Sequence, residues 1–250
     1  MQIRTLDYED GAVSLSGLLV YDDTSVTKRP GIVLFPDARG IGEHAIDCAR
    51  RLTGLGFVTL VADLYGNGMQ ARDTAHAWEL MRDLRSDVTL WRRRAQAALD
   101  ALARQDNVDR ARLAALGYCF GGSTALELGR SGAPVLGIVS FHGGLSSPRP
   151  DDAQHIKGKV LVCHGALDPF VPLSEVTAFE EQMSKTSVDW QVCVYGGAMH
   201  AFTNPAANVE GMAYHAAADR RSWNAMSALF EEIFQPAGRS GSASRPQEIG

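Results

Sequence analysis

Apolar positions along the chain gather in short uninterrupted runs, and longer amphipathic stretches separate them. Residues 31–35, Gly-Ile-Val-Leu-Phe, form a run typical of a strand buried on both faces. Similar runs occur at residues 57–62, 112–118, 135–141, 159–164 and 190–195. Helical periodicity is found at residues 43–55, 74–104, 121–129, 173–184 and 212–234, with two helices meeting near 85–87 in the second stretch. Strands that alternate with helices predict right-handed crossovers and a parallel sheet.

The N-terminal segment follows a different pattern. Two strand-like segments, residues 3–8 and 12–21, flank Asp10-Gly11, a pair that favours a tight hairpin turn. We therefore predict an α/β fold with a mostly parallel central sheet, an antiparallel N-terminal hairpin and helices on both faces. Residues 1–235 are expected to form one domain. Residues 236–250 are rich in Gly, Ser, Pro and Arg, which predicts a disordered tail.

Composition narrows the class of protein. The chain has 250 residues, and its net charge of -5 argues against nucleic acid as a partner. Its four cysteines include no Cys-x-x-Cys pair, so we expect reduced thiols in a reducing compartment. No apolar signal core or run of membrane-spanning length is present, so we expect a cytoplasmic protein without a membrane partner. A monomer and a homodimer both remain open.

A reactive side chain follows the apolar run at 112–118. The spacing Gly117-x-Cys119-x-Gly121 is the thiol version of Gly-x-Ser-x-Gly, in which a tight strand-to-helix turn presents the central side chain as a nucleophile. Cys119 would then lie at a helix N-terminus, where backbone N–H groups favour a thiolate. The alternative is an inert buried cysteine beside a glycine-rich turn.

Two later strand ends supply the partners that a nucleophile of this kind needs. Asp168 follows the run at 159–164, and His200 follows the run at 190–195. Their order after Cys119 is that of the acid and the base in an α/β-hydrolase, because both come from loops at the carboxyl edge of the same sheet. His200 would accept the thiol proton and activate water, and Asp168 would orient the imidazole.

The oxyanion hole of such a site uses the N–H that follows the nucleophile and one N–H from the loop after the first parallel strand. Those positions are Phe120 and Ala38. The helical stretch at 74–104 is a candidate for a wall of the substrate pocket. Side chains near the triad are candidates for binding substrate or modulating the thiol: Asp37, Arg39, Tyr118, Phe202 and Asn204.

Other chemistry-bearing residues have simpler interpretations. Asp63 precedes the nucleophile and suits a structural turn, and His142 and His164 are expected to make structural hydrogen bonds. A zinc site built from Cys163, His164, Cys193 and His200 lacks a recognisable ligand spacing, and no phosphate-binding glycine loop is present. We therefore predict no metal and no cofactor.

These motifs together resemble the dienelactone hydrolase (carboxymethylenebutenolidase) family. The similarity lies in five segments: Asp63-Leu64-Tyr65-Gly66, Gly117-Tyr118-Cys119-Phe120-Gly121-Gly122, Phe141-His142-Gly143-Gly144, His164-Gly165-Ala166-Leu167-Asp168-Pro169 and His200-Ala201-Phe202. The resemblance implies an α/β-hydrolase fold, with the nucleophile, acid and base of the family at Cys119, Asp168 and His200.

The chain also departs from that family. Asp37 stands where type members have a glutamate that helps to form the thiolate, and Asn204 stands where they have an arginine for the substrate carboxylate. Arg72 and Arg82 are the nearby candidates for a second arginine. The resemblance therefore implies a cofactor-independent hydrolase of a small ester or lactone, without the dienelactone-specific clamp. A non-hydrolytic ligand-binding protein and a redox-responsive thiol protein on the same fold stay open as alternatives.

Overall fold

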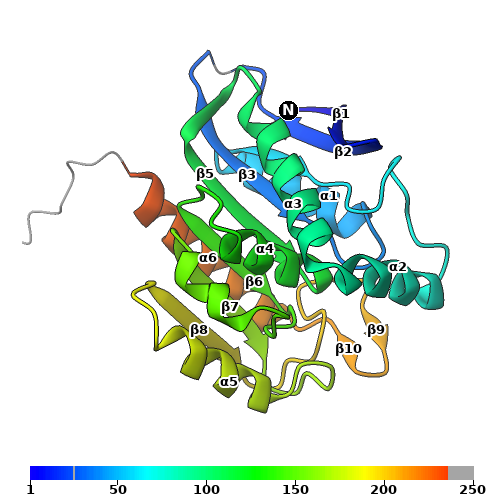
Figure 1. Ribbon diagram of the computed structural model, residues 1–250, viewed down its shortest axis with the longest axis vertical. Coiled ribbons are helices and arrows are strands. Elements are labelled where there is room, and N and C mark those ends of the chain that lie inside the picture. The colour runs from blue at the N-terminus through cyan, green and yellow to red at the C-terminus, as the bar shows by residue number, and fades with distance from the viewer. Residues whose placement is uncertain (25, 236–250) are drawn as a thin grey trace, which may run out of the picture.

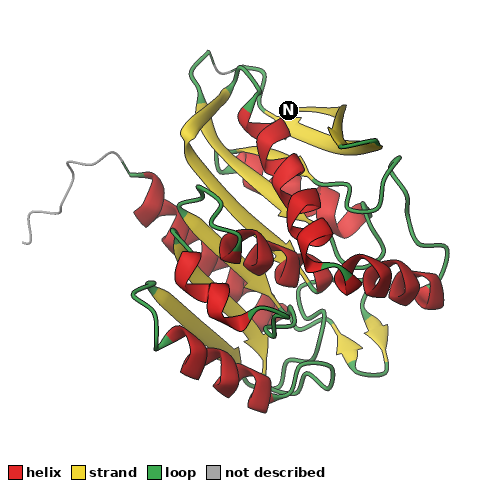
Figure 2. Cartoon of the chain, in the orientation of Figure 1, coloured by secondary structure: helices red, strands yellow, loops and turns green. Residues whose placement is uncertain are grey.

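An eight-stranded sheet forms the centre of the molecule (Figures 1 and 2). The structure is a computed structural model that describes residues 1–24 and 26–235, so the expected tail at 236–250 lies outside the described residues. The sheet order is β1-β2-β4-β3-β5-β6-β7-β8, and every neighbouring pair from β4 to β8 is parallel. The strands are β1 (Gln2–Asp10), β2 (Val13–Tyr21), β3 (Arg29–Phe35), β4 (Val58–Val61), β5 (Val108–Tyr118), β6 (Gly137–Phe141), β7 (Lys159–Gly165) and β8 (Trp190–Tyr195).

The predicted fold class is confirmed. β1 and β2 form the antiparallel hairpin, whose turn at Gly11 has the positive φ of 61° that glycine tolerates. The helices are α1 (Glu43–Gly54), α2 (Thr74–Ser86), α3 (Val88–Ala103), α4 (Phe120–Arg130), α5 (Leu173–Met183) and α6 (Ala216–Phe234). Figure 1 shows α3 and α4 in front of the sheet and α6 behind it.

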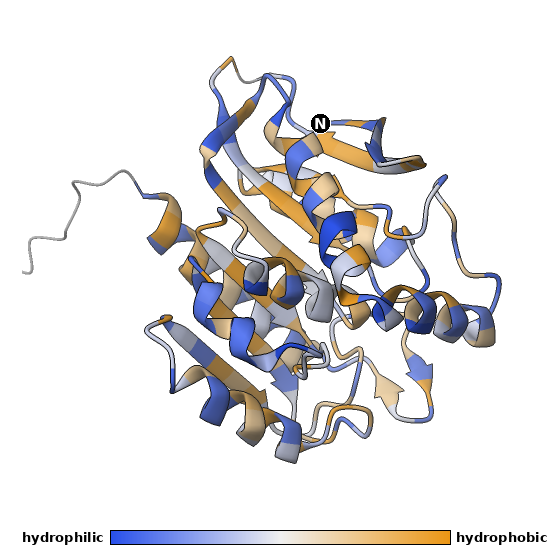
Figure 3. Ribbon diagram, viewed as in Figure 1, coloured by the Kyte–Doolittle hydropathy of each residue, from blue (hydrophilic) through white to orange (hydrophobic). Residues whose placement is uncertain are grey.

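Side-chain alternation along the strands feeds two cores, one on each face. Val33 and Phe35 point to the face covered by α3, α4 and α5, whereas Ile32 and Leu34 point to the face covered by α1 and α6. Because both faces are covered, the middle parts of the central strands are largely apolar, and Figure 3 shows orange along much of them. None of the helices in the described part of the chain is long and apolar enough to cross a membrane.

Two boundaries differ by four residues from the sequence prediction. β5 begins at Val108 rather than at 112, because its pairing with β3 shifts register where Pro30 faces Asp109 and Gly31 faces Leu113. Polar residues fill this irregularity, so the apolar run begins later than the strand. The last helix begins at Ala216 rather than at 212, because Met212–Ala213 (β10) pairs with Asn208–Val209 (β9). A short 3₁₀ helix, Pro150–His155 (η1), was not predicted.

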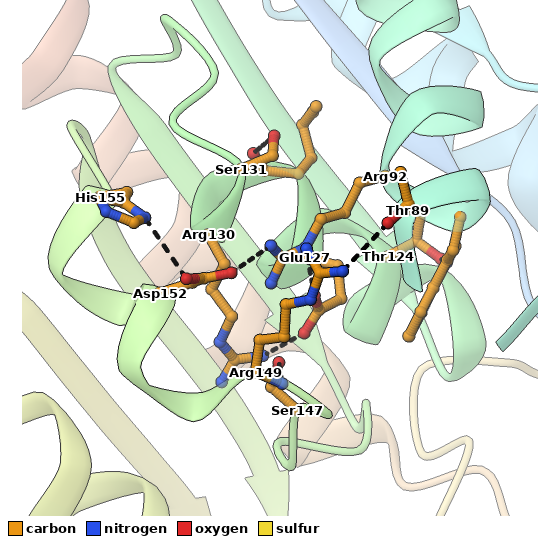
Figure 4. A network of polar contacts seen from close by, with 12 residues as sticks. Thr89, Arg92, Thr124, Glu127, Arg130, Ser131, Ser147, Arg149, Asp152 and His155 are labelled. Atoms are coloured by element: carbon orange, nitrogen blue, oxygen red, sulfur yellow. Dashed lines mark hydrogen bonds and ion pairs between the residues drawn. The ribbon is translucent and has the colours of Figure 1, made fainter. Parts of the chain in front are cut away.

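A buried ion network anchors α4 to its neighbours (Figure 4). The Glu127 carboxylate accepts hydrogen bonds from Arg92 Nε of α3 at 2.8 Å and from Arg130 Nη1 at 2.9 Å. Arg92 also contacts Asp152 of η1, and Arg130 Nη2 donates to the carbonyl of Leu145 at 2.7 Å. The network fixes the helix whose N-terminus carries Cys119.

Candidate active site

Cys119 occupies a strained turn between β5 and α4. Its φ of 54° and ψ of -118° lie in a region that non-glycine residues rarely adopt. A Cβ on Gly117 would lie 2.0 Å from the carbonyl oxygen of Gly121, and a Cβ on Gly121 would lie 2.0 Å from that of Phe35. Only glycine therefore fits on either side, and the partly exposed Cys119 side chain stands at the N-terminus of α4.

Asp168 and His200 meet at the same edge of the sheet. His200 Nδ1 lies 2.7 Å from Asp168 Oδ2, and both side chains are buried. Asp168 Oδ1 accepts the backbone N–H groups of Phe170 and Val171 at 2.9 and 3.1 Å, which fixes the carboxylate. The loop of His200 is held by a bridge to Met212 of β10.

The electrostatic surroundings favour the charged form of His200. Burial lowers its pKa, but hydrogen bonds and negative charge from Asp168 and from Cys119 outweigh burial and raise that pKa to about 10. Because Nδ1 faces Asp168, Nε2 is the ring nitrogen available to Cys119. The structure therefore brings together the three side chains that the chain order predicted as nucleophile, acid and base.

The two predicted oxyanion donors lie in well-supported positions. In the described chain, no backbone or side-chain acceptor bonds the N–H of Phe120 or of Ala38. Tyr65 donates its hydroxyl to the carbonyl of Ala38 at 2.9 Å, which holds the Ala38–Arg39 peptide unit, next to the unit whose N–H is the predicted donor. The Phe120 ring is stacked between Trp91, at 5.3 Å between centroids, and Tyr65, at 6.3 Å.

The five neighbouring candidates separate into three groups. Tyr118 and Phe202 are buried, the former stacked on Phe141 at 4.8 Å, so their side chains face the core rather than a substrate. Asp37 Oδ1 accepts the N–H of Arg39 at 2.8 Å, and Asn204 Oδ1 accepts that of Ala206 at 2.9 Å. Both therefore stabilise their own loops. The exposed side chain of Arg39 has no partner within the described ranges.

An apolar rim beside His200 was missed in the sequence. The Phe170 ring meets the His200 ring edge-on at 5.3 Å, and Trp78 of α2 lies 6.4 Å from Phe170. These rings are 43% and 49% exposed. Leu167 and Met199, on the loops of the acid and the base, are exposed too. The position of α2 at this rim supports its prediction as a pocket wall, and the unusual exposure of its tryptophan is visible only in the structure.

The remaining chemistry-bearing residues have mixed outcomes. Asp63 accepts backbone N–H groups of Ser16, Tyr65, Gly66 and Gly68 and is a structural turn residue, as predicted. His142 is hydrogen-bonded, as expected. The expectation for His164 is wrong, because its buried ring has no hydrogen-bond partner in the structure's described residues. Over residues 1–24 and 26–235, no group of three His, Cys, Asp or Glu side chains is arranged to hold a metal ion.

Comparisons with known proteins point to one family. The sequence model of the dienelactone hydrolase family matches residues 15–234. A solved structure named m3DLH is 46% identical, covers 94% of this chain and 99% of its own, and has a TM-score of 0.91. A dienelactone hydrolase-like promiscuous phosphotriesterase from metagenomic libraries is 45% identical over the same shares, with a TM-score of 0.89. A Bradyrhizobium protein named "probable 2-oxo-3-(5-oxofuran-2-ylidene)propanoate lactonase" is 29% identical over 80% of this chain and 82% of its own.

Proposed function

The chain belongs to the dienelactone hydrolase family and is an ester or lactone hydrolase of the α/β-hydrolase fold, and we propose that it works through Cys119, His200 and Asp168. The observation that carries this proposal is the convergence at one sheet edge. Cys119 stands in a strained elbow, and His200 faces it through one nitrogen while the other nitrogen is held by Asp168.

The first half of the reaction forms a thioester. His200 already holds the proton of the Cys119 thiol on Nε2, as its raised pKa favours, and the paired sulfur attacks the carbonyl carbon of the ester. The N–H groups of Phe120 and Ala38 donate to the resulting oxyanion. When the carbon–oxygen bond breaks, His200 returns the proton to the leaving alkoxide, and the acyl group remains on Cys119.

The second half releases the acid. His200 removes a proton from water, and the hydroxide attacks the thioester carbonyl in the same oxyanion site. The carbon–sulfur bond then breaks, which releases the acid. The sulfur of Cys119 is again paired with His200, which keeps the proton taken from water. Asp168 keeps Nε2 directed at the sulfur and stabilises the imidazolium in both halves.

The rim points to substrates with an apolar group beside His200. Phe170 and Trp78 offer exposed aromatic surface there, and Asn204 supplies no positive charge at the position where type members of the family have an arginine. We therefore propose a small, largely uncharged ester or lactone.

A steady-state comparison tests the nucleophile. We expect the wild type to release p-nitrophenol from p-nitrophenyl acetate and Cys119→Ala to lose that rate. Cys193→Ala is the matched control, because Cys193 is also a partly exposed free thiol but lies on β8. Hydrolysis unchanged in Cys119→Ala would refute the mechanism. Thiol-reversible oxidation of Cys119 without hydrolysis of any ester would instead support the redox alternative.

A second reaction at the same site follows from one relative. The 45% identical phosphotriesterase and the uncharged rim lead us to propose that this chain also accepts neutral phosphotriesters. The sulfur would displace an aryloxide from phosphorus, and water would then release the phosphodiester from Cys119. Release of p-nitrophenol from paraoxon, lost in Cys119→Ala, is the expected result, and no turnover of paraoxon by an active esterase would contradict it.

A further inference from the structure

His142 lies immediately behind the nucleophile. It follows β6, its φ is 41°, and its ring is buried. Nδ1 accepts the backbone N–H of Cys119 at 3.2 Å, an N–H that also reaches the carbonyl of Phe141 at 2.9 Å. On the other side of the ring, Nε2 lies 2.8 Å from Thr203 Oγ1. The imidazole is thus bound at both nitrogens.

The identity of these partners defines which nitrogen of the His142 ring carries a proton. A backbone amide can only donate, so Nδ1 of His142 carries no proton. The neutral ring then has its proton on Nε2, which donates it to Thr203. Burial, followed by the positive charge of the nearby His200, lowers the pKa of His142 well below its ordinary value. Its ring therefore stays neutral while His200 is charged.

Thr203 connects this ring to the loop of the general base. It lies three residues after His200, and the His142 ring packs at 5.1 Å from the ring of His200 and at 5.2 Å from that of Phe202. His44 of α1 holds Thr203 from the far side, with Nε2 3.2 Å from the Thr203 carbonyl oxygen and 3.4 Å from its Oγ1, a longer contact than the 2.8 Å to His142. One buried imidazole consequently contacts both the elbow and the base loop.

We propose that His142 is a positioning residue that joins the Cys119 elbow to the His200 loop and so fixes the separation between thiol and imidazole. This inference rests on the proposed role of Cys119 and His200. The elbow is strained at Cys119, and a strained backbone persists only where surrounding contacts hold it. The His142 ring supplies such a contact to the elbow, and the same ring contacts Thr203 in the loop that carries His200.

Thr203→Val tests the link without removing the ring. Valine has the shape of threonine but cannot accept the proton on Nε2, so the ring loses its tie to the base loop. We expect kcat/KM for p-nitrophenyl acetate to fall about 10- to 100-fold, mainly through kcat, because small misplacements of catalytic groups have effects of this size. Thr203→Ser retains the hydroxyl and should restore the rate. Thr59→Val is the matched control, since Thr59 is buried in β4 and its hydroxyl has no partner in the described chain.

Alkylation of Cys119 by iodoacetamide gives a readout that does not need ester hydrolysis. A looser pairing with His200 leaves the sulfur less reactive, so alkylation at a fixed pH should slow several-fold in Thr203→Val and not in Thr203→Ser. The other titratable groups around the His142 ring are His44, His164 and Tyr118. They are unchanged in both variants.

His142→Asn provides a second, independent variant. Its amide oxygen can still accept the N–H of Cys119, and asparagine tolerates positive φ, but the side chain is too short to reach Thr203. The same loss as in Thr203→Val is expected, with little further loss in the double variant. Wild-type kcat and alkylation rate in Thr203→Val, or an equal loss in Thr203→Ser, would overturn the inference. Hydrolysis that survives in Cys119→Ala would instead refute the proposed function.

Discussion

Glu127→Gln should destabilise the protein strongly without touching the reacting groups. The Glu127 side chain is 1% exposed and accepts from Arg92 and from Arg130, whose side chain is also 1% exposed (Figure 4). Glutamine keeps one oxygen acceptor but removes the negative charge. Two guanidinium groups then remain near one carboxylate, that of Asp152.

The size of the effect follows from burial. Removing one partner of a buried ion pair costs about 3–5 kcal/mol, because the remaining charge stays in a medium of low dielectric. We expect the lower end, about 3 kcal/mol, since the glutamine oxygen still accepts one hydrogen bond. For a domain of this length, that free energy corresponds to a Tm lower by about 6–12 °C.

Thermal unfolding followed by circular dichroism measures this difference. Glu232→Gln is the matched control, because Glu232 pairs with Lys159 on the surface and its side chain is 59% exposed. Exposed pairs contribute about 1 kcal/mol or less, so this variant should lose no more than about 3 °C. Equal Tm values for the two variants would refute the argument that the α4 network stabilises through buried charge.

Three further predictions concern the site. Asp168→Asn should lower kcat roughly 10³- to 10⁴-fold, because the imidazole loses its orienting carboxylate, and NMR titration should find the pKa of His200 well below about 10. The folded-state pKa of His200 is raised above the usual 6.5 of histidine, so His200 contributes stability that is fully present below pH 6.5 and is lost as pH rises through about 10. Urea unfolding at several pH values should show this decline in the wild type. The free energy of unfolding of Asp168→Asn should depend less on pH. Tyr65→Phe should lower kcat about 10-fold, less than the loss of a whole oxyanion donor, with KM little changed, because it frees only the Ala38–Arg39 peptide unit that adjoins the donor N–H. An unchanged kcat would show that Tyr65 does not support the donor.

Much of the fold can be predicted because burial on both faces leaves a plain pattern. The run at 31–35 has no polar interruption, and its neighbours are nearly as apolar, so the parallel sheet is evident in the sequence. Strand pairing is not encoded in this way. The register shift opposite Pro30 and the β9–β10 pairing depend on contacts distant in sequence, which is why β5 and α6 begin elsewhere than predicted.

The site, too, could be predicted only in part from the sequence. The positions of Cys119, Asp168 and His200 follow from chain order, since each comes after a strand whose carboxyl end lies at the same edge of a parallel sheet. The direction of a side chain is harder to infer. Tyr118 precedes the nucleophile by one residue, yet its ring is buried on the face of α1 and α6. Thr203 gave no sequence signal at all, because its contact with His142 joins two loops far apart in the chain.

Trapping the acyl-enzyme tests the central claim most directly. Wild type and Cys119→Ala would each be mixed with p-nitrophenyl acetate, quenched in acid during turnover and measured by intact mass spectrometry. The proposed mechanism predicts one added acetyl group in the wild type, located on the peptide that contains Cys119, and none in Cys119→Ala. Turnover without acetylation of Cys119, or acetylation and turnover that persist in Cys119→Ala, would contradict it.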